Sequence, residues 1–293
     1  MSYDLYFKAR DQKSTLSVDG FVAYFKRRSN YEVTDQQAIY QNQITGVYFV
    51  FDFGKIKTDE QNRRLPVAFN LNYYRPHIFG LEAEPEIQSF VREFNLLVID
   101  DQLGGMGEGE YSSLGFLNGW NRGNEFAYQA FLQQKPESVP PSLSTSQIEE
   151  CWRWNLAQPG IQQKYGEDVF VPRYMFTLRD GKVNRTVVWP DAIPTALPEA
   201  DVYLIIRKTV LPKKFFFPVK EDKVFASGND LKSVLEQFPV EPSAVPYRLL
   251  RYSNPPDSII SLIRRLKPTD EKPVGVTVDK ILNLEIIEKF KRK

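Results

Sequence analysis

The chain has 293 residues, of which 42% are hydrophobic and 14% aromatic, with 21 Phe and 15 Tyr. This composition excludes a disordered chain, and the length favours two domains over one because single cores are commonest at about 100–150 residues. Lys and Arg total 38 against 37 Asp and Glu, which excludes a global field that would draw the protein to nucleic acid or anionic lipid.

The N-terminus and the cysteine count bear on where the protein works. Residues 1–10 show no basic segment followed by an apolar core, and no uncharged apolar run approaches the ~18 residues of a membrane span. Cys151 is the one cysteine of the sequence, so it can form neither an internal disulfide nor a thiolate metal site. We therefore expect a cytoplasmic protein with no membrane-spanning segment.

The first third of the chain alternates strand and helix patterns. Apolar residues fall on every second position of 47–53, which is the period of a strand, whereas those of 87–94 recur at helical spacing. The expected elements are strands at 4–9, 38–42, 47–53, 67–73 and 96–99 and helices at 18–28 and 87–94. Their order predicts an open, mostly antiparallel sheet with helices packed on one face, which is an α+β arrangement.

A domain boundary is expected near the middle of the chain. A loop rich in Gly and Glu at 103–113 precedes a long helix over 117–131. Residues 136–145 then contain three prolines and three serines with little apolar content, as linkers do. We therefore assign residues 1–135 to an N-terminal α+β domain, 136–145 to a Pro/Ser-rich linker and 146–293 to a C-terminal α+β domain.

The C-terminal domain is expected to mix helices and strands as well. Ser146 and Glu149 have the spacing of a capping box, which predicts a helix that ends at Pro159-Gly160. Asp180-Gly181 predicts a hairpin turn. The other expected elements are strands at 174–178, 183–189, 202–206 and 215–219, helices at 231–238 and 259–266, and a basic tail with Lys289, Lys291, Arg292 and Lys293.

The sequence offers few residues for catalysis. His77 is the only histidine, so any histidine-dependent triad, dyad or metal cluster would have to use it. No G-x-S-x-G motif presents a serine nucleophile, and a dyad of Cys151 with His77 would have to form across the domain boundary. Cys151 is better explained as a structural residue on the buried face of a helix. We therefore predict no catalytic residue, no metal site and no cofactor.

Carboxylates cluster in the N-terminal domain. They are Glu82, Glu84, Glu86, Asp100, Asp101, Glu108 and Glu110. The three glutamates at 82–86 are expected in the first turn of a helix, where the helix dipole favours negative charge. Their i, i+2, i+4 spacing does not share one helical face, which argues against a divalent-metal site. Two interpretations remain open, a solvated helix start or an acidic face that binds a partner.

The Gly-rich segment 104–109 follows a predicted strand, which is where a phosphate-binding loop would lie. It has neither the Lys-Ser or Lys-Thr ending of a P-loop nor G-x-G-x-x-G spacing, and the neighbouring carboxylates would repel phosphate. A surface loop explains it better. Basic residues at 207–214, at 264–267 and in the tail are scattered and lack a recognition-helix or RNP pattern, so we expect no direct binding of nucleic acid.

The segment 189–198 contains three prolines with apolar neighbours, which predicts a stiff loop that is ordered by packing or by a partner. Two interpretations of Trp189 follow. If its side chain is buried, it is a core residue. If its side chain is exposed on this rigid loop, it would be a good interface anchor, because tryptophan is enriched among the residues that carry binding energy.

Four groups of residues carry a resemblance to a known family. They are Gly46-Val47-Tyr48-Phe49, Phe69-Asn70-Leu71-Asn72-Tyr73-Tyr74-Arg75-Pro76, Trp120-Asn121 with Gly123-Asn124, and Trp189-Pro190 with Pro194, Pro198 and Asp201. With these motifs the sequence, from Tyr3 to about Leu250, resembles a family of bacterial proteins similar to the immunity proteins of interbacterial toxin systems, both polymorphic and type VI secreted. The motifs are aromatic and structural rather than chemical.

The resemblance implies a cytoplasmic, non-enzymatic protein that binds one cognate toxin and blocks it, although no binding residue carries over. The candidate partner-binding residues are therefore the seven carboxylates above and Trp189. An acidic face would suit a nuclease toxin, because opposite fields speed encounter. Two alternatives stay open, a structural or adaptor protein of a phage-defence or secretion assembly with a large apolar patch, and an enzyme that uses carboxylates alone. No oligomeric state is implied.

Overall fold

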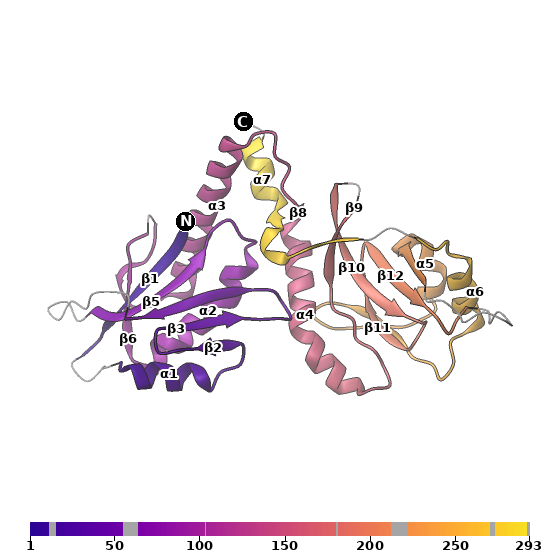
Figure 1. The fold of residues 1–293 in the computed structure, drawn as a ribbon, viewed down its shortest axis with the longest axis horizontal. Coiled ribbons are helices and arrows are strands. Elements are labelled where there is room, and N and C mark those ends of the chain that lie inside the picture. Colours follow the sequence, from indigo (N-terminus) through magenta and orange to yellow (C-terminus); the bar gives the residue numbers. More distant parts are fainter. Residues whose placement is uncertain are drawn as a thin grey trace. The chain divides into compact units, whose positions relative to one another are not determined.

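The computed structural model describes residues 1–11, 16–54, 64–102, 104–179, 181–211, 222–269 and 273–291 (Figure 1). The chain divides into two compact units. Unit 1 comprises Met1–Thr145 and Val278–Lys293, and unit 2 comprises Ser146–Thr277. The expected domains differ from these units at the end of the chain, because Val278–Lys293 belongs to unit 1 and not to the second domain.

Unit 1 contains a seven-stranded sheet in the order β2-β3-β4-β5-β1-β6-β7, and each pairing among the described strands is antiparallel. The α+β class with a large antiparallel sheet is therefore confirmed. The strands are β1 (Ser2–Ala9), β2 (Tyr31–Val33), β3 (Gln37–Gln41), β4 (Tyr48–Phe53), β5 (Arg64–Asn72), β6 (Leu96–Asp100) and β7 (Gly107–Gly109).

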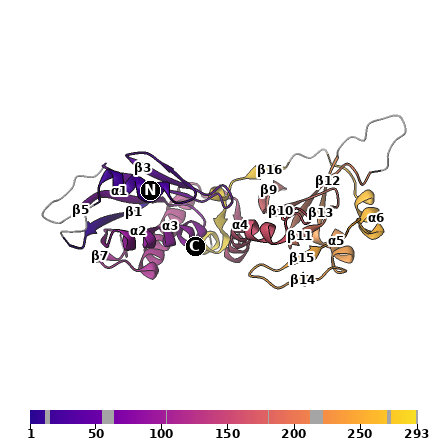
Figure 2. The same ribbon diagram turned by 90° about the horizontal axis from the view of Figure 1, so that it is seen from below.

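Three helices of unit 1, α1 (Val18–Lys26), α2 (Ile78–Glu93) and α3 (Ser113–Gln134), pack on one face of this sheet. Alternate strand residues point into that layer, and the core is largely aromatic. Phe90 of α2, for example, lies with its ring centroid 5.0 Å from Phe7 and 5.1 Å from Phe51, which is the range of favourable edge-on and tilted ring pairs. Figure 2 shows α2 and α3 along the same side of the strands.

Helix α2 begins earlier than the sequence indicated. It starts at Ile78 and continues through Pro85, so Glu82, Glu84 and Glu86 lie in its middle and not in its first turn. The sequence pattern was misleading because a proline inside a helix removes a backbone hydrogen bond and usually marks a boundary. The interpretation of these glutamates as a solvated helix start is therefore wrong.

Helix α3 runs without interruption through Gly119 and Gly123, as the expected long helix required. Both glycines are close-contact positions. A Cβ added at Gly119 would lie 3.1 Å from the Tyr3 hydroxyl oxygen, and one added at Gly123 would overlap the Tyr73 ring. The absence of a side chain therefore allows Tyr3 and Tyr73 to approach the helix backbone.

The end of the chain completes unit 1. Strand β17 (Leu282–Asn283) pairs in parallel with β8 (Ser142–Leu143), and α7 (Leu284–Lys291) packs on α3. A small core of Tyr128, Leu132, Leu282 and Ile287 joins these elements. The chain thus leaves unit 1 just after β8. It returns through the short 3₁₀ helix at Val278–Lys280 to β17, which pairs with β8. Unit 2 is an insertion in unit 1.

Unit 2 contains a five-stranded sheet in the order β13-β12-β10-β9-β16, in which β10 and β12 are parallel and the other pairs antiparallel. A second sheet has the order β11-β15-β14. The strands are β9 (Met175–Arg179), β10 (Lys182–Pro190), β11 (Thr195–Pro198), β12 (Val202–Arg207), β13 (Asp222–Ser227), β14 (Val240–Glu241), β15 (Tyr247–Leu250) and β16 (Val274–Val276).

Most expected elements of unit 2 are confirmed. Its helices are α4 (Thr145–Tyr165), α5 (Gly228–Leu235) and α6 (Asp257–Arg265). One stop signal is wrong, because α4 continues through Pro159-Gly160. The expected strand at 215–219 and the turn residue Asp180 lie outside the described residues. None of the helices in the described ranges combines the length and apolar character needed to cross a bilayer.

We predict that Gly123→Ala lowers the free energy of unfolding by about 1–3 kcal/mol, because the added methyl group would overlap the Tyr73 ring. Gly160→Ala is the matched control. No atom lies within 4 Å of a Cβ built at Gly160 in α4, so alanine should stabilise that helix by about 0.5–1 kcal/mol. Urea unfolding followed by circular dichroism measures both, and equal effects would contradict the predicted packing.

Candidate functional site

His77 is part of a partly buried hydrogen-bond network in unit 1. Its backbone N–H donates to Oδ1 of Asn283 at 3.0 Å, and its ring Nδ1 lies 2.8 Å from Nδ2 of the same side chain. Because the amide nitrogen of Asn283 can only donate, Nδ1 accepts, and this pairing assigns the ring proton to Nε2. The only histidine therefore connects the start of α2 to β17.

The turn that precedes α2, residues 73–77, is held by two side chains of α3. Asn124 accepts hydrogen bonds from the backbone N–H groups of Tyr74 at 2.7 Å and Arg75 at 3.2 Å, and its Nδ2 donates to the Arg75 carbonyl at 2.8 Å. The Tyr128 hydroxyl donates to the same carbonyl at 3.0 Å. Asn124 and the 73–77 turn thus satisfy one another's polar groups.

Cys151 lies on the buried side of α4 and is 1% exposed. Burial raises the pKa of its thiol, so the thiolate that a cysteine nucleophile requires is disfavoured. His77 lies in the other unit. The side chain of Cys151 therefore has the properties of a small core residue, as the sequence suggested.

Glu82 is a buried carboxylate, with 6% of its surface exposed. Its Oε1 accepts hydrogen bonds from the Tyr40 hydroxyl at 2.8 Å, from Asn42 Nδ2 at 2.7 Å and from the Thr45 hydroxyl at 2.9 Å. These three donors belong to β3 and to the loop that follows it. Glu82 thus fastens α2 to the hairpin formed by β3 and β4, and its carboxylate is not available to a partner.

Asp100 is also buried, and the Gly-rich loop folds around it. Its carboxylate accepts bonds from the backbone N–H groups of Gln102 at 3.2 Å and Met106 at 2.8 Å, and from the Tyr3 hydroxyl. Gly105 has to be glycine because a Cβ there would overlap the carboxylate. Burial and the bond to Asp100 raise the pKa of the Tyr3 hydroxyl. The loop is therefore ordered by an internal anion.

The other predicted carboxylates lie nearer the surface, and most are paired within unit 1. Glu86 binds Arg28 at 2.8 Å and the Tyr31 hydroxyl at 3.0 Å, and Glu84 accepts a bond from the Tyr111 hydroxyl at 3.1 Å. Glu108 pairs with Lys8 and Glu110 with Arg10, and the hydrogen bond from Arg10 lowers the pKa of Glu110. Asp101 is exposed.

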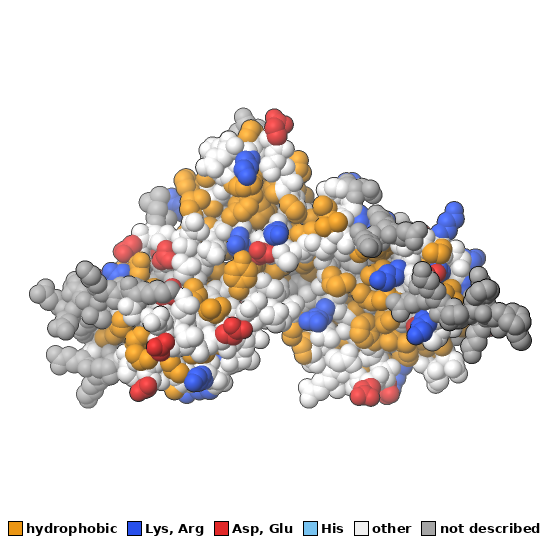
Figure 3. Space-filling view, in the orientation of Figure 1, with side chains coloured by type: hydrophobic (Ala, Val, Ile, Leu, Met, Phe, Trp, Pro, Cys, Tyr) orange, Lys and Arg blue, Asp and Glu red, His pale blue; other side chains and the backbone are white. Residues whose placement is uncertain are grey.

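The seven carboxylates therefore do not form one anionic face, since two are buried and four are matched by cations or tyrosines. On the face drawn in Figure 3, acidic side chains are scattered singly over unit 1. Within the described ranges, no three His, Cys, Asp or Glu side chains come together in a way that could hold a metal ion.

Trp189 is fully buried in unit 2, and its indole N–H donates to the Ile193 carbonyl at 3.0 Å. Asp191 fixes the same loop, because its Oδ1 accepts bonds from the backbone N–H groups of Lys208 at 2.6 Å and Thr209 at 2.7 Å. The loop is thus ordered by packing. The interpretation of Trp189 as an exposed interface anchor is wrong.

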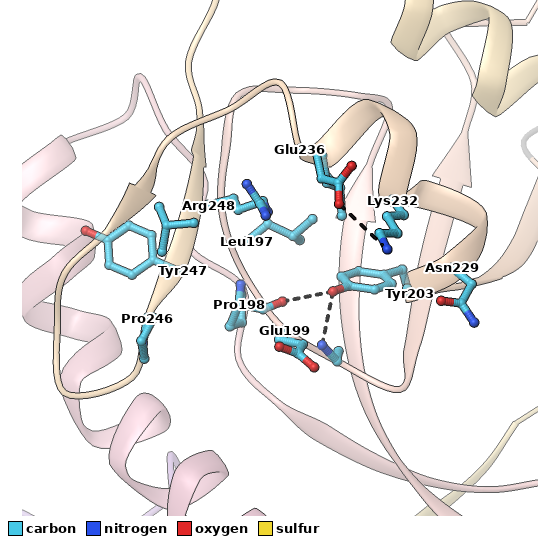
Figure 4. Close-up of a pocket in the computed structure, with 14 residues that line it drawn as sticks. Leu197, Pro198, Glu199, Tyr203, Asn229, Lys232, Glu236, Pro246, Tyr247 and Arg248 are labelled. Atoms are coloured by element: carbon cyan, nitrogen blue, oxygen red, sulfur yellow. Dashed lines mark hydrogen bonds and ion pairs between the residues drawn. The ribbon is translucent and has the colours of Figure 1, made fainter.

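A half-open groove of about 410 Å³ lies in unit 2, and we call it the unit 2 groove (Figure 4). One wall is α5 with Asn229, Lys232 and Glu236, which follow one another at i, i+3 and i+7 and so share a helical face. The opposite wall is the β11-β15-β14 sheet. At the base, the Tyr203 hydroxyl donates to the Pro198 carbonyl at 3.2 Å and accepts from the Ala200 N–H at 3.0 Å.

The sheet wall presents a single row of side chains to the unit 2 groove. Leu197, Arg248 and Val240 are direct neighbours across β11, β15 and β14, so they point to the same side. Leu197 is buried, Arg248 is half-buried and Val240 is 51% exposed. Sequence reasoning missed this site. Its one signal was the proline-rich stretch around Pro239, Pro242 and Pro246, because ordered loops often carry binding residues.

Comparisons with protein-family models, with curated proteins and with solved structures find no match for this chain.

We predict that Glu82→Ala lowers the free energy of unfolding by about 3 kcal/mol or more, since it leaves three buried donors without their acceptor. Asp101→Ala, which removes an exposed carboxylate, should change it by less than about 0.5 kcal/mol. Chemical denaturation of both variants gives these values. Similar stabilities for the two variants would show that Glu82 does not hold α2 to the β3-β4 hairpin.

We also predict that the Cys151 thiol of the folded protein reacts with a disulfide reagent at least about 100-fold more slowly than in denaturant, because it is buried and its pKa is raised. Absorbance of the released thiolate at neutral pH measures the rate. Fast reaction of the folded protein would mean that Cys151 is accessible and ionised.

Proposed function

We propose that this protein is a binding protein without chemistry of its own, which neutralises a bacterial toxin by covering it. The proposal joins the family resemblance in the sequence to the roles of particular side chains in the structure. It concerns the whole chain, because unit 2 is inserted within unit 1.

The observation that carries the proposal is where the residues of the resemblance lie. Asn124 holds the 73–77 turn, Gly123 admits the Tyr73 ring, and Trp189 is bonded within its own loop. Asp201 binds the guanidinium of Arg185 at 3.0 Å. In an enzyme, the residues that define the family are expected to converge on a reactive pocket. In this chain they build the scaffold, which suits proteins whose function lies in a variable binding surface.

The two residues best suited to neutral-pH catalysis support the same proposal. His77 is bonded to Asn283, and the Cys151 thiol is buried with a raised pKa. The unit 2 groove does contain charged groups, but Lys232 and Glu236 are 67% and 56% exposed and lie 3.8 Å apart. Groups in that position are solvated, as side chains of a recognition surface usually are.

The chemistry of the toxin stays open in this proposal. A nuclease toxin would suit an acidic face on this protein. The carboxylates that could form such a face are largely paired with Arg28, Lys8, Arg10 and tyrosines inside unit 1. A neutralising protein needs a surface complementary to its partner, and the formal charge of +1 gives that surface no predetermined sign.

The test of the proposal begins with capture of a partner by the full chain from its native host and identification by mass spectrometry. The gene of that partner is then expressed alone and together with this chain in a sensitive bacterium. We expect the partner alone to stop growth and co-expression to restore colony counts by at least about 100-fold, as tight neutralisation requires. The Gly160→Ala variant is a suitable positive control, because it changes no contact.

Two results would contradict the proposal. One is a captured partner that does not impair growth, which would favour an adaptor in a larger assembly. The other is a growth-inhibiting partner whose effect persists although this chain is co-expressed and bound.

A further inference from the structure

Two arginines of unit 2 that are withdrawn from solvent are paired with carboxylates. Arg185 is 7% exposed and binds Asp201 and Glu150, and Arg207 is 2% exposed and binds Asp222. Removing a cation from water costs free energy unless an anion compensates, and in both cases a carboxylate does so. These two residues show how this unit normally accommodates an arginine that is withdrawn from solvent.

Arg248 departs from that pattern. It is half-buried on the sheet wall of the unit 2 groove, and its Nη1 donates to the Phe238 carbonyl at 2.8 Å. Among the described residues, this is the one hydrogen bond of its guanidinium, and no carboxylate forms an ion pair with it. A guanidinium has five N–H donors, so most of its donors point to the groove or to solvent. The arrangement is suited to an anionic group that arrives from outside.

The opposite wall of the groove adds a second cation. Lys232 extends from α5, and its pairing with Glu236 at 3.8 Å is weak because both side chains are largely exposed. In Figure 4, Lys232 and Glu236 reach from the helix towards the space that Arg248 borders from the sheet. Arg248 and Lys232 both line the groove, one from each wall, so a carboxylate that enters the groove has a cation on either side.

The shape of the groove favours a segment of protein over a small molecule. Small-molecule sites enclose most of their ligand and are mainly apolar, whereas this groove is half-open and carries charged side chains on its rim. It ends at β14, which is the last strand of its sheet in the described part of the chain. An edge strand can accept an extended chain as a further strand, and the exposed Val240 offers that chain an apolar contact.

We infer that the unit 2 groove binds an extended segment of the partner protein, with an acidic side chain of that segment between Arg248 and Lys232 and an apolar side chain beside Val240. The inference rests on the proposed function, and it names the part of the protein that makes the contact. The occupant is a peptide segment of another protein, and not a second copy of this chain.

The test uses the full-length protein as bait for a phage-displayed library of random short peptides. We expect enriched sequences to contain Asp or Glu next to apolar residues, and synthetic peptides of these sequences to bind Arg248→Met at least about tenfold more weakly than the wild type. Arg251→Met, which removes an exposed arginine just after β15, is the matched control and should bind as the wild type does. Circular dichroism confirms that both variants are folded.

A second pair of variants does not depend on Arg248. Val240→Asp places a carboxylate beside Arg248 on the sheet wall of the groove. It should weaken binding by at least about tenfold, because the added charge repels the acidic peptide. Val274→Asp makes the same change on the exposed strand β16, where Val274 is 61% exposed, and should have no effect.

The inference is overturned if no sequence is enriched, if the enriched sequences lack acidic residues, or if they bind Arg248→Met as well as the wild type. It is also overturned if the chain self-associates in sedimentation experiments and Arg248→Met abolishes that association.

Failure of this inference is distinct from failure of the proposed function. If Arg248→Met still protects cells from the toxin, the groove is not the contact although the protein neutralises. If the wild type gives no protection, the proposed function fails whatever the peptides show.

Discussion

The side chain of Asn283 connects segments of unit 1 that are far apart in the sequence. Its amide bonds the backbone and ring of His77 at 3.0 and 2.8 Å, and its Nδ2 also donates to the Thr145 hydroxyl at 2.9 Å. Its own backbone N–H donates to the Tyr128 hydroxyl at 3.2 Å. Asn283 is 1% exposed, so these bonds are shielded from water, and each polar group would be costly to leave unpaired. The turn before α2, helix α3 and the exit towards unit 2 all depend on this residue.

That dependence explains the arrangement of the chain. Asn283 arrives only after the whole of unit 2, so unit 1 cannot satisfy its buried polar groups until the return segment has paired β17 with β8. The same segment brings Val278 against Gly46, where a Cβ would lie 2.7 Å from a Val278 methyl. The order of unit 1 therefore depends on contacts of very long sequence separation, and the two ends of unit 2 are fixed by adjacent strands. The polar groups of the scaffold are therefore largely satisfied within unit 1.

Local pattern was enough to predict much of this fold. The alternation at 47–53 produced β4, the apolar spacing at 18–28 produced α1, and the consecutive strands paired as an antiparallel sheet because short connections favour neighbours. Local pattern failed where a distant contact decided the outcome. Pro85 lies inside α2, a helix that Glu82 fastens to Asn42 and its neighbours. Lys289 and Lys291 lie in α7, which forms because α3 offers its apolar residues a packing surface.

The candidate site was harder to predict, for the same reason. A cluster of carboxylates in the sequence resembles a binding face until their partners are known, and Tyr3, Tyr40 and Arg28 come from strands and loops far from them in the chain. Conversely, Arg248 is unremarkable in the sequence, and only the tertiary structure reveals that, within the described ranges, no carboxylate pairs with it as one does with Arg185 and Arg207. Pairing is a property of three-dimensional neighbours, so unpaired charge cannot be read from spacing.

The segment that follows unit 2 completes unit 1. Native-state amide hydrogen exchange, read by mass spectrometry on the full chain and on a chain truncated after Thr277, tests it most directly. We expect truncation to remove protection from α2 and α3 while the strands of unit 2 keep theirs, because only unit 1 loses the bonds of Asn283 and the packing of α7. Unchanged protection of α2 and α3 in the truncated chain would contradict the claim.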